Sequence, residues 1–371
     1  MNLRMPSETS LLWCFLMIFG ASFPSISTGQ TRNYKPSPHS ASEEKASAGA
    51  ATDVEYREDF SSLSLKGSLF FPLSPALGQV DDFPQNSFVR ERWQLMWRPS
   101  DPIDLFICKP RGVAKPPVIL YLYTYPSSTD RFKSDDWCGT TTANGFAAVA
   151  FVSAYTGHRL EMRPPAATFF TNFQESLGAT VHDVQLILNY LASRGDLDMG
   201  RIGMYGQGSG GTIAILASAV DARVKAIDVL TPWGDWPNFF SQIRFIAADQ
   251  RAKYSAPDFL ARVAPLEPLT WLPKVKASSV RIQDVRKSGP MPDASQEGLE
   301  SVAPETAIIN QFGDPAALVS HASGGALFAW LRAQLQPDAK PQVAQQKSER
   351  IHFFPASGVS ALPPFGPQSK N

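Results

Sequence analysis

Two nearly continuous apolar runs, at residues 117–125 and 146–154, constrain the fold of this chain more than any other feature. Strands that are buried on both faces have this pattern, because neither face of such a strand meets water. Further short apolar runs follow at residues 201–205, 224–230, 279–285 and 306–312. Together these runs predict a series of short, buried strands along the chain.

Helical patterns separate the later strands. Within residues 179–193, four apolar side chains recur at steps of three, four and three, on one face of a helix: Val181, Val184, Leu188 and Leu191. Residues 210–220 and 325–335 also indicate helices. Strands that alternate with helices predict right-handed crossovers and a mostly parallel sheet that helices cover on both faces.

The first strands are arranged differently. Residues 88–97 and 103–110 have strand patterns and are joined by the short sequence RPSDP, which favours a turn. Strands joined by so short a connection pair in antiparallel fashion. We therefore expect one α/β domain with a sheet of about eight strands, antiparallel at its start, mostly parallel afterwards and flanked by helices.

Length and composition agree with one large domain and exclude little else. The chain has 371 residues, of which 43% are hydrophobic, and its formal net charge is zero. A chain of this length buries a sizeable core. Because its charges balance, there is no electrostatic reason to expect binding to nucleic acid or to an anionic membrane surface.

The N-terminus has the features of a signal peptide. Arg4 precedes an apolar run at residues 11–23, which is short for a membrane span but typical of a signal-peptide core. Ser25 and Ser27 are small residues two positions apart, so we expect cleavage after Ser27 and a secreted or periplasmic protein without a stable membrane span. An uncleaved anchor is the alternative.

Composition divides the rest of the chain. Residues 28–54 are rich in Ser, Ala, Lys and Pro and lack apolar periodicity, which is typical of a disordered linker. Residues 55–340 carry the strand and helix patterns and form the predicted domain, with a β extension at its start. Residues 341–371 form a tail rich in proline and polar residues.

Two cysteines remain after the signal peptide, Cys108 and Cys138. In an oxidising compartment they could form a disulfide between an early strand and the first helix. Two separate buried thiols are the alternative, and the sequence leaves both open. No group of histidines and cysteines has the spacing of a zinc site, so we expect neither a metal nor another cofactor.

The sequence GRIGMYGQGSGG, residues 200–211, resembles the strand, nucleophile elbow and helix start of the α/β-hydrolase family. The resemblance covers roughly residues 88–335, and the order of strands supports it. Within the family, the chain is most similar to the dienelactone hydrolases and acetyl xylan esterases. The resemblance implies a serine ester hydrolase that works through an acyl-enzyme.

The elbow departs from the family's G-x-S-x-G pattern. Aligned by the preceding strand, the motif begins at Gly206 and puts Gly208 in the place of the nucleophile. Centring the motif on Ser209 instead puts Gln207 where a small residue is needed. We therefore predict that Gly208 occupies the apex of the turn.

Three roles for Ser209 remain open at this point. Its hydroxyl could cap the following helix, or it could be a slightly displaced nucleophile. In the third alternative, the backbone amides of Gly208 and Ser209 hold an anion or a carbonyl group without a nucleophile. Replacing Gly208 with Ser would restore the motif, and we expect this to raise esterase activity if His321 and a carboxylate are in place.

The resemblance also implies partners for a nucleophile. His321 follows the last strand by a predicted loop, where the family places its general base. The acid is Asp235, after the sixth strand, or Asp284, at the end of the seventh. By contrast, His182 flanks the apolar face of its helix, where we expect it to be solvated or bonded locally.

Further residues are candidates for binding. The backbone N–H groups of Thr124 or Tyr125, together with that of Ser209, could hold an oxyanion. His158, Trp233 and Trp236 follow strand ends, where they could line the crevice and bind substrate. Aromatic loops of this kind suit sugar or aromatic-ester substrates, and we expect a small-molecule ester or a carbohydrate ester.

Two hypotheses about function result. The first is an exported serine ester hydrolase in which Ser209 attacks, His321 transfers the proton, and Asp235 or Asp284 orients the imidazole ring. The second is a non-catalytic α/β-hydrolase-like binding protein with Gly208 at the nucleophile position. The fold by itself does not separate them, because function resides in the site.

Overall fold

The computed structural model describes residues 55–125, 130–154, 159, 172–244, 246–287, 289–323 and 325–336. The predicted signal peptide, the linker and the C-terminal tail lie outside these ranges, as does His158. Within them, no helix combines the length and the apolar character that crossing a membrane requires.

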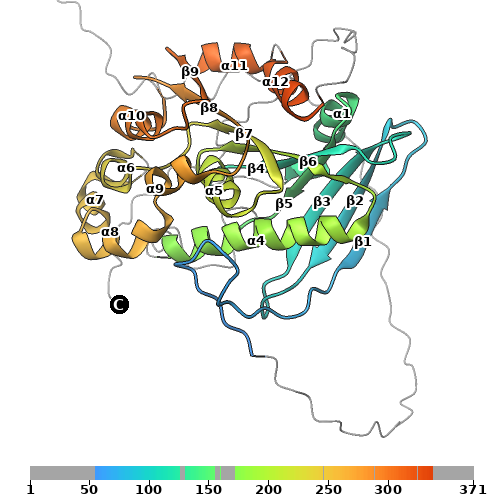
Figure 1. Ribbon diagram of the computed structural model, residues 1–371, viewed down its shortest axis with the longest axis horizontal. Helices are drawn as coiled ribbons and strands as arrows, with labels where there is room; N and C mark the ends of the chain where they lie inside the picture. Colours follow the sequence, from blue (N-terminus) through green and yellow to red (C-terminus); the bar gives the residue numbers. More distant parts are fainter. Residues whose placement is uncertain are drawn as a thin grey trace, which may run out of the picture. The chain divides into compact units, whose positions relative to one another are not determined.

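A single sheet of nine strands forms the centre of the described domain, in the order β1-β2-β3-β5-β4-β6-β7-β8-β9 (Figure 1). The strands are β1 (Ala76–Asp81), β2 (Phe88–Leu95), β3 (Ile103–Pro110), β4 (Pro117–Leu122), β5 (Ala147–Phe151), β6 (Asp198–Gln207), β7 (Val224–Leu230), β8 (Ser279–Val285) and β9 (Ile308–Phe312). Pairing is antiparallel from β1 through β3 to β5 and parallel from β5 to β9. The predicted class, a mostly parallel sheet with an antiparallel start, is confirmed.

Helices cover both faces of the sheet (Figure 1). One face carries α4 (Phe173–Arg194), α5 (Ser209–Val220), α6 (Trp236–Gln242), α7 (Ala248–Tyr254), α8 (Pro257–Val263), η3 (Ala264–Leu266), α9 (Pro268–Trp271), η4 (Leu272–Lys274) and α10 (Asp293–Ser301). The other face carries η2 (Asp130–Lys133), α1 (Asp135–Ala143), α11 (Pro315–Ser323) and α12 (Ala326–Leu335). Each layer of helices encloses a separate apolar core against the sheet.

The strand missing from the sequence prediction is β1, at the edge of the sheet. It pairs with β2, but five of its six residues are exposed, including Leu77 at 52%. An edge strand that packs against nothing has no buried face, so it lacks the alternation by which strands are recognised. Its existence depends on the hydrogen bonds that β2 offers.

Cys108 on β3 and Cys138 in α1 form a disulfide, with their Cα atoms 5.5 Å apart. Both residues are fully buried in the core beneath α1 and α12. The first of the two alternatives for these cysteines is thereby confirmed. The bond closes a loop that contains β4 and the start of α1.

We expect reduction of this disulfide to destabilise the domain. The two cysteines are 30 residues apart, and the loop-entropy relation for that separation gives about 3–4 kcal/mol. Urea denaturation with and without a reductant measures the difference. The double variant Cys108→Ala/Cys138→Ala is the control, because a reductant should not change its midpoint; an unchanged midpoint for the reduced wild type would contradict the expectation.

Residues 55–72, named the strap from here on, cross α4 before the chain enters the sheet. A Cβ atom at Gly178 of α4 would lie 2.4 Å from the carbonyl oxygen of Phe60, so only glycine permits this approach. Leu63 inserts into the core on that side and is 2% exposed. The strap is therefore an integral part of the domain.

Candidate functional site

The turn between β6 and α5 has the geometry of an elbow. Gly208 stands at its apex with φ 53° and ψ −121°, a conformation that side chains rarely adopt. Its N–H donates to the carbonyl of Leu230 at 2.9 Å, which ties the apex to the neighbouring strand β7. The prediction that Gly208, not Ser209, occupies the apex is confirmed.

Two flanking glycines allow the strand and the helix to approach each other. A Cβ atom at Gly206 would lie 2.5 Å from the carbonyl oxygen of Gly210. A Cβ atom at Gly210 would lie 2.0 Å from the carbonyl oxygen of Leu122 on β4. Because no side chain fits at either position, the register that places Gly208 between them is the one that the packing requires.

The space where a nucleophilic side chain would stand is already filled. A Cβ atom at Gly208 would lie 2.2 Å from Oγ1 of Thr124, 2.8 Å from its Cβ and 3.1 Å from Nε1 of Trp233. Real Cβ atoms do not come this close to other heavy atoms, so Thr124 would have to move. The expectation that Gly208→Ser raises esterase activity, if His321 and a carboxylate are in place, stays a prediction; the new side chain would also clash with Thr124.

Ser209 is the first residue of α5 and is 1% exposed. Its hydroxyl oxygen accepts a hydrogen bond from the N–H of Tyr125 at 2.9 Å, and its own N–H donates to Oγ1 of Thr124 at 3.4 Å. The hydroxyl is thus directed at Tyr125 and not at the first turn of α5. The Ser209 side chain therefore does not cap this helix. Two of the predicted oxyanion donors, the amides of Tyr125 and Ser209, are paired within the protein.

His321 lies within α11 and not in a loop. Asp314 accepts a hydrogen bond from the N–H of Ala317 at 2.8 Å, and Pro315 is the first residue of the helix. An aspartate cap followed by proline is a helix-start signal, and it could have been recognised in the sequence. His321 is exposed and its ring centroid is 5.2 Å from that of Phe312. Among the described residues it has no hydrogen bond to Ser209 or to a carboxylate.

Asp235 adopts a left-handed conformation, with φ 55° and ψ 64°, just before α6. Its Oδ2 accepts a hydrogen bond from Nδ2 of Asn238 at 2.7 Å, and its N–H donates to Glu267. The carboxylate also lies against Gly298 of α10, where a Cβ atom would be 2.8 Å from Oδ2. Asp235 therefore organises the start of α6 and its contact with α10.

Asp284 is fully buried on β8, and within the described ranges neither of its carboxyl oxygens has a hydrogen-bond donor. Burial and the neighbouring carboxylate of Glu300 raise its pKa well above the ordinary value. Oε2 of Glu300 forms an ion pair with Arg286 and accepts a hydrogen bond from Nε2 of Gln311, each at 2.6 Å. A raised pKa disfavours the negative charge with which a carboxylate orients a catalytic imidazole.

The two tryptophans lie in the core. Trp233 is 3% and Trp236 1% exposed, and both contact the ring of Phe173 at the start of α4. Phe239 and Phe240 of α6 complete this aromatic cluster. Trp236 lies edge-to-face with Phe173 and Phe239, whereas Trp233 is stacked on Phe173. Aromatic pairs in such geometries stabilise a core. These tryptophans therefore hold α4 against α6 and offer little surface to a ligand.

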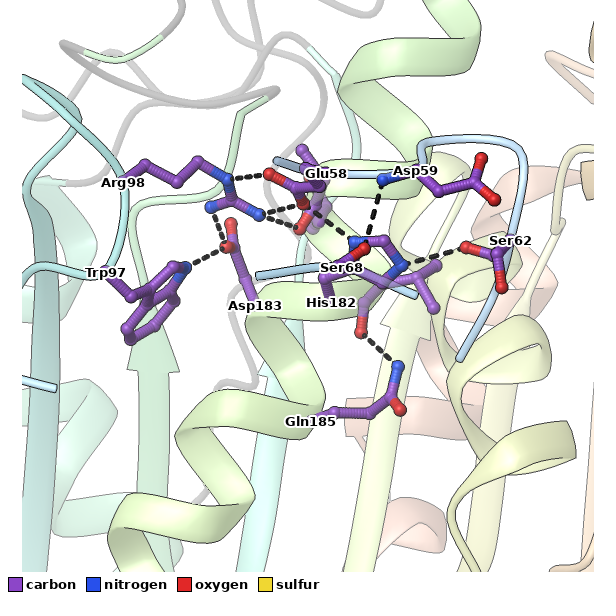
Figure 2. A network of polar contacts seen from close by, with 12 residues as sticks. Glu58, Asp59, Ser62, Ser68, Trp97, Arg98, His182, Asp183 and Gln185 are labelled. Atoms are coloured by element: carbon purple, nitrogen blue, oxygen red, sulfur yellow. Dashed lines mark hydrogen bonds and ion pairs between the residues drawn. The ribbon is translucent and has the colours of Figure 1, made fainter. Parts of the chain in front are cut away.

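A buried charged network, which the sequence did not reveal, lies between the strap, the β2–β3 turn and α4 (Figure 2). Arg98 binds Glu58 at 2.5 and 2.6 Å and also pairs with Asp183. Arg159 pairs with the same Asp183 at 2.8 Å and with Asp101 at 2.6 Å. Isolated charges far apart in sequence carry no periodic signal, so only the fold brings them together.

The charges in this network support one another. Although burial opposes ionisation, the positive charges of Arg98 and Arg159 lower the pKa of Asp183. Burial likewise opposes ionisation of Glu58, but hydrogen bonds from Arg98 and His182 lower its pKa to about 2. Removing one partner from such a buried pair leaves an uncompensated charge, which is strongly destabilising. In the described part of the chain, this network included, no three His, Cys, Asp or Glu side chains are grouped to hold a metal ion.

We expect Gly208→Ser to destabilise the protein by about 2–5 kcal/mol, because it combines backbone strain with a clash against Thr124. The double variant Gly208→Ser/Thr124→Gly should recover part of that loss, since the second change removes both clashing atoms. Chemical denaturation measures each variant. Gly313→Ala is the control, because nothing lies within 4 Å of a Cβ atom there; equal losses at the two glycines would contradict the packing argument.

The raised pKa of Asp284 should make the stability of the protein depend on pH. Its pKa is higher in the folded than in the unfolded chain, so the unfolded chain releases the proton first as pH rises. The free energy of unfolding therefore falls as pH rises above the ordinary aspartate value of 3.8. Asp284→Asn should be more stable than wild type at pH 8, with the difference shrinking towards pH 4. The exposed Asp258→Asn is the control, and a difference that does not depend on pH would refute the assignment.

No protein-family profile matches the chain, and no curated protein sequence matches it. Solved structures do. Acetyl xylan esterase 1 from Thermoanaerobacterium sp. JW/SL YS485 is similar with a TM-score of 0.58 and 13% identity, over 71% of this chain and 88% of the esterase. An acetyl xylan esterase from Paenibacillus sp. R4 is similar with a TM-score of 0.53 and 17% identity, over 71% and 90%.

A third similar structure is a hydrolase of another kind. The S-formylglutathione hydrolase from Agrobacterium tumefaciens is similar with a TM-score of 0.51 and 11% identity, over 70% of this chain and 99% of the hydrolase. Identities this low establish the fold and nothing about the reaction. The strand order, the glycine turn after β6 and these matches show that the chain has the α/β-hydrolase fold.

Proposed function

We propose that this chain is an exported, non-catalytic α/β-hydrolase-fold protein that binds a small-molecule ester or carbohydrate ester without forming an acyl-enzyme. One observation carries the proposal. The apex of the elbow is Gly208, and Thr124 and Trp233 fill the space that a nucleophilic side chain would need.

The positions of the other groups that acyl transfer needs also support a non-catalytic role. The reaction needs a base within hydrogen-bond reach of the nucleophile and free donors for the oxyanion. In the described structure, His321 is exposed on α11 and contacts Phe312. The amide of Tyr125 is bound to the Ser209 hydroxyl, the group that would have to attack.

The ligand class is inferred from the structural relatives. The two acetyl xylan esterases cover about seven tenths of this chain with TM-scores above 0.5. Their names indicate acetyl esters of a polysaccharide as the natural class to test first. A fold that keeps its elbow backbone can keep a ligand site after the nucleophile is lost.

Export is supported by two independent features. The N-terminal sequence has the pattern of a signal peptide, with Arg4 before the apolar run at residues 11–23. The pairing of Cys108 with Cys138 suits an oxidising compartment, where disulfides persist.

A serine ester hydrolase with Ser209 as nucleophile is the second candidate. The observation that favours it is the position of the Ser209 hydroxyl, one residue past the apex and 2.9 Å from a backbone N–H. In that case Tyr125 would release the hydroxyl and donate to the oxyanion instead. The two candidates differ in whether Ser209 becomes covalently modified.

Treatment with a fluorophosphonate probe, followed by peptide mapping, distinguishes the candidates. We expect no labelling of Ser209 and equal, negligible hydrolysis of p-nitrophenyl acetate by wild type, Ser209→Ala and His321→Gln. Stoichiometric labelling of Ser209, or turnover that disappears in a folded Ser209→Ala variant, would establish the second candidate instead.

Binding and export are tested on the same preparation. Titration calorimetry with acetylated xylo-oligosaccharide should give a heat of binding that the deacetylated sugar does not give. No heat of binding with either sugar would exclude this ligand class.

For export, we expect the N-terminal sequence of the exported protein to begin near Thr28. An intact Met1 on cytosolic protein would contradict export.

A further inference from the structure

Exposed apolar side chains gather along β1, the edge strand of the sheet (Figure 1). Leu77 and Val80 of this strand are 52% and 47% exposed, and Leu73 before it and Phe83 after it are exposed as well. Soluble proteins seldom leave large apolar side chains together on an unpaired strand, because the free backbone groups of such a strand pair with other chains. The margin of the sheet at β1 is therefore a candidate contact surface.

A bulge at Gly78 places two of these side chains on the same face of the sheet. In the pairing with β2, Leu77 lies opposite Trp93 and Val80 lies opposite Glu91. Trp93 and Glu91 share a face, and the indole Nε1 donates to Oε2 of the glutamate at 2.8 Å. Leu77 and Val80 therefore point to one face although they are three residues apart. A regular strand would place residues at that spacing on opposite faces.

The face that carries Leu77 and Val80 continues the apolar core beyond α4. The ring of Trp93 lies edge-on to that of Tyr190 near the end of α4, with centroids 5.7 Å apart, and packs against the core on this side of the sheet. Leu77 and Val80 follow Trp93 towards the unpaired edge. A second apolar surface placed there would extend the core across the edge.

The charges along the strand favour an antiparallel partner. Residues 73–80 contain no charged side chain, whereas Asp81 and Asp82 stand at the C-terminal end of the strand. A parallel copy of β1 would place these acidic groups beside their equals, which is unfavourable. An antiparallel copy would place them beside the uncharged start of the strand instead.

We propose that β1 joins two copies of this chain, paired antiparallel about a two-fold axis that passes between Gly78 and Gln79. This axis brings Leu77 of each copy opposite Val80 of the other. Residues that pair across such an axis must point to the same face of the joined sheet. The bulge meets this condition for Leu77 and Val80, so β1 is complementary to itself.

The opposite face of the strand meets the same condition. Ala76 and Asp81 pair with β2 residues four positions apart, so both point to the face that carries Arg92. The two-fold axis brings Asp81 of each copy opposite Ala76 of the other. Arg92 reaches over the bulge towards the edge, with Nε 3.4 Å from the place where a Cβ atom of Gly78 would stand. Two symmetric pairs of opposite charge, Arg92 with the other copy's Asp81, therefore flank the axis.

A strand from another protein could also bind an exposed edge. A second copy is the occupant that the observations favour, because both faces of β1 and its charges match under one two-fold axis, and two-fold dimers are the commonest assemblies. The inference does not depend on the proposed function, since β1 lies outside the elbow.

Sedimentation velocity of the full chain tests the dimer, which we expect at tens of micromolar. Leu77→Lys/Val80→Lys should raise its Kd by at least about a hundredfold, because the axis places lysines opposite each other twice. Ile308→Lys/Ile309→Lys is the matched control, since these exposed residues lie on the other edge strand, β9, and it should leave the dimer intact. Circular dichroism confirms that both variants are folded. A monomeric wild type, or a dimer that the β1 variant retains, would overturn the proposal.

Shortened chains test whether another segment of the same chain covers the edge. Variants without residues 1–54 or without residues 341–371 should dimerise with the Kd of the full chain. A monomeric full chain whose shortened form dimerises would assign the edge to the removed segment and overturn the proposal.

Oxidative cross-linking tests the register. Cβ atoms directly opposite each other in an antiparallel pair lie about 4.5–5.5 Å apart, so a disulfide can join them. A mixture of Leu77→Cys and Val80→Cys chains should therefore cross-link, whereas either variant alone should not. Cys108 and Cys138 are buried and paired, and Cys14→Ser in the background removes the remaining thiol. Cross-linking that is as efficient in Leu77→Cys alone would overturn this pairing.

Discussion

The close approach of α5 to β4 and β6 is the constraint on which the rest of the structure depends. Gly206 and Gly210 are in contact with backbone atoms at distances that leave no room for a side chain. Because these two residues have no side chains, α5 packs closely against the middle strands of the sheet. There it contacts β4, β6, β7 and α4. Gly208 between them supplies the positive φ that turns the chain from strand to helix.

That same constraint explains why the elbow keeps its backbone shape with a glycine at the apex. The turn is needed to pack α5, so its shape is retained for structural reasons alone. The apex side chain is not needed for packing, and in this chain Thr124 and Trp233 occupy its place. The amides around the turn are then satisfied by Thr124 and by the Ser209 hydroxyl, as buried donors must be.

Two buried aspartates illustrate how the surroundings decide the charge of a carboxyl group. Asp183 and Asp284 are both fully buried. The pKa of Asp183 is lowered because Arg98 and Arg159 bind it, whereas burial and Glu300 raise the pKa of Asp284. The network beneath the strap therefore contains carboxylates with lowered pKa values, whereas the carboxyl group at the end of β8 has a raised pKa.

The sequence by itself determined the class of fold and the register of the elbow. Buried parallel strands have continuous apolar runs, so β7 and β8 were predicted at their observed bounds. The alignment of the elbow by its strand, together with the glycine spacing, placed Gly208 at the apex. Edge strand β1 was missed, because a strand with no buried face has no periodic pattern. Helix α11 was taken for a loop, although Asp314 and Pro315 signalled its start.

Only the tertiary structure decided which polar residues meet. His182, read as solvated or locally bonded, is buried against a segment about 120 residues earlier in the chain. His321 and Asp235 occupy positions that suited a triad, yet His321 contacts Phe312 and Asp235 binds Asn238. Within the described residues, the carboxyl oxygens of Asp284 have no hydrogen-bond donor. The physical reason is that apolar burial follows a local period, which a sequence displays, whereas ion pairs and hydrogen bonds depend on distances that exist only after the chain has folded.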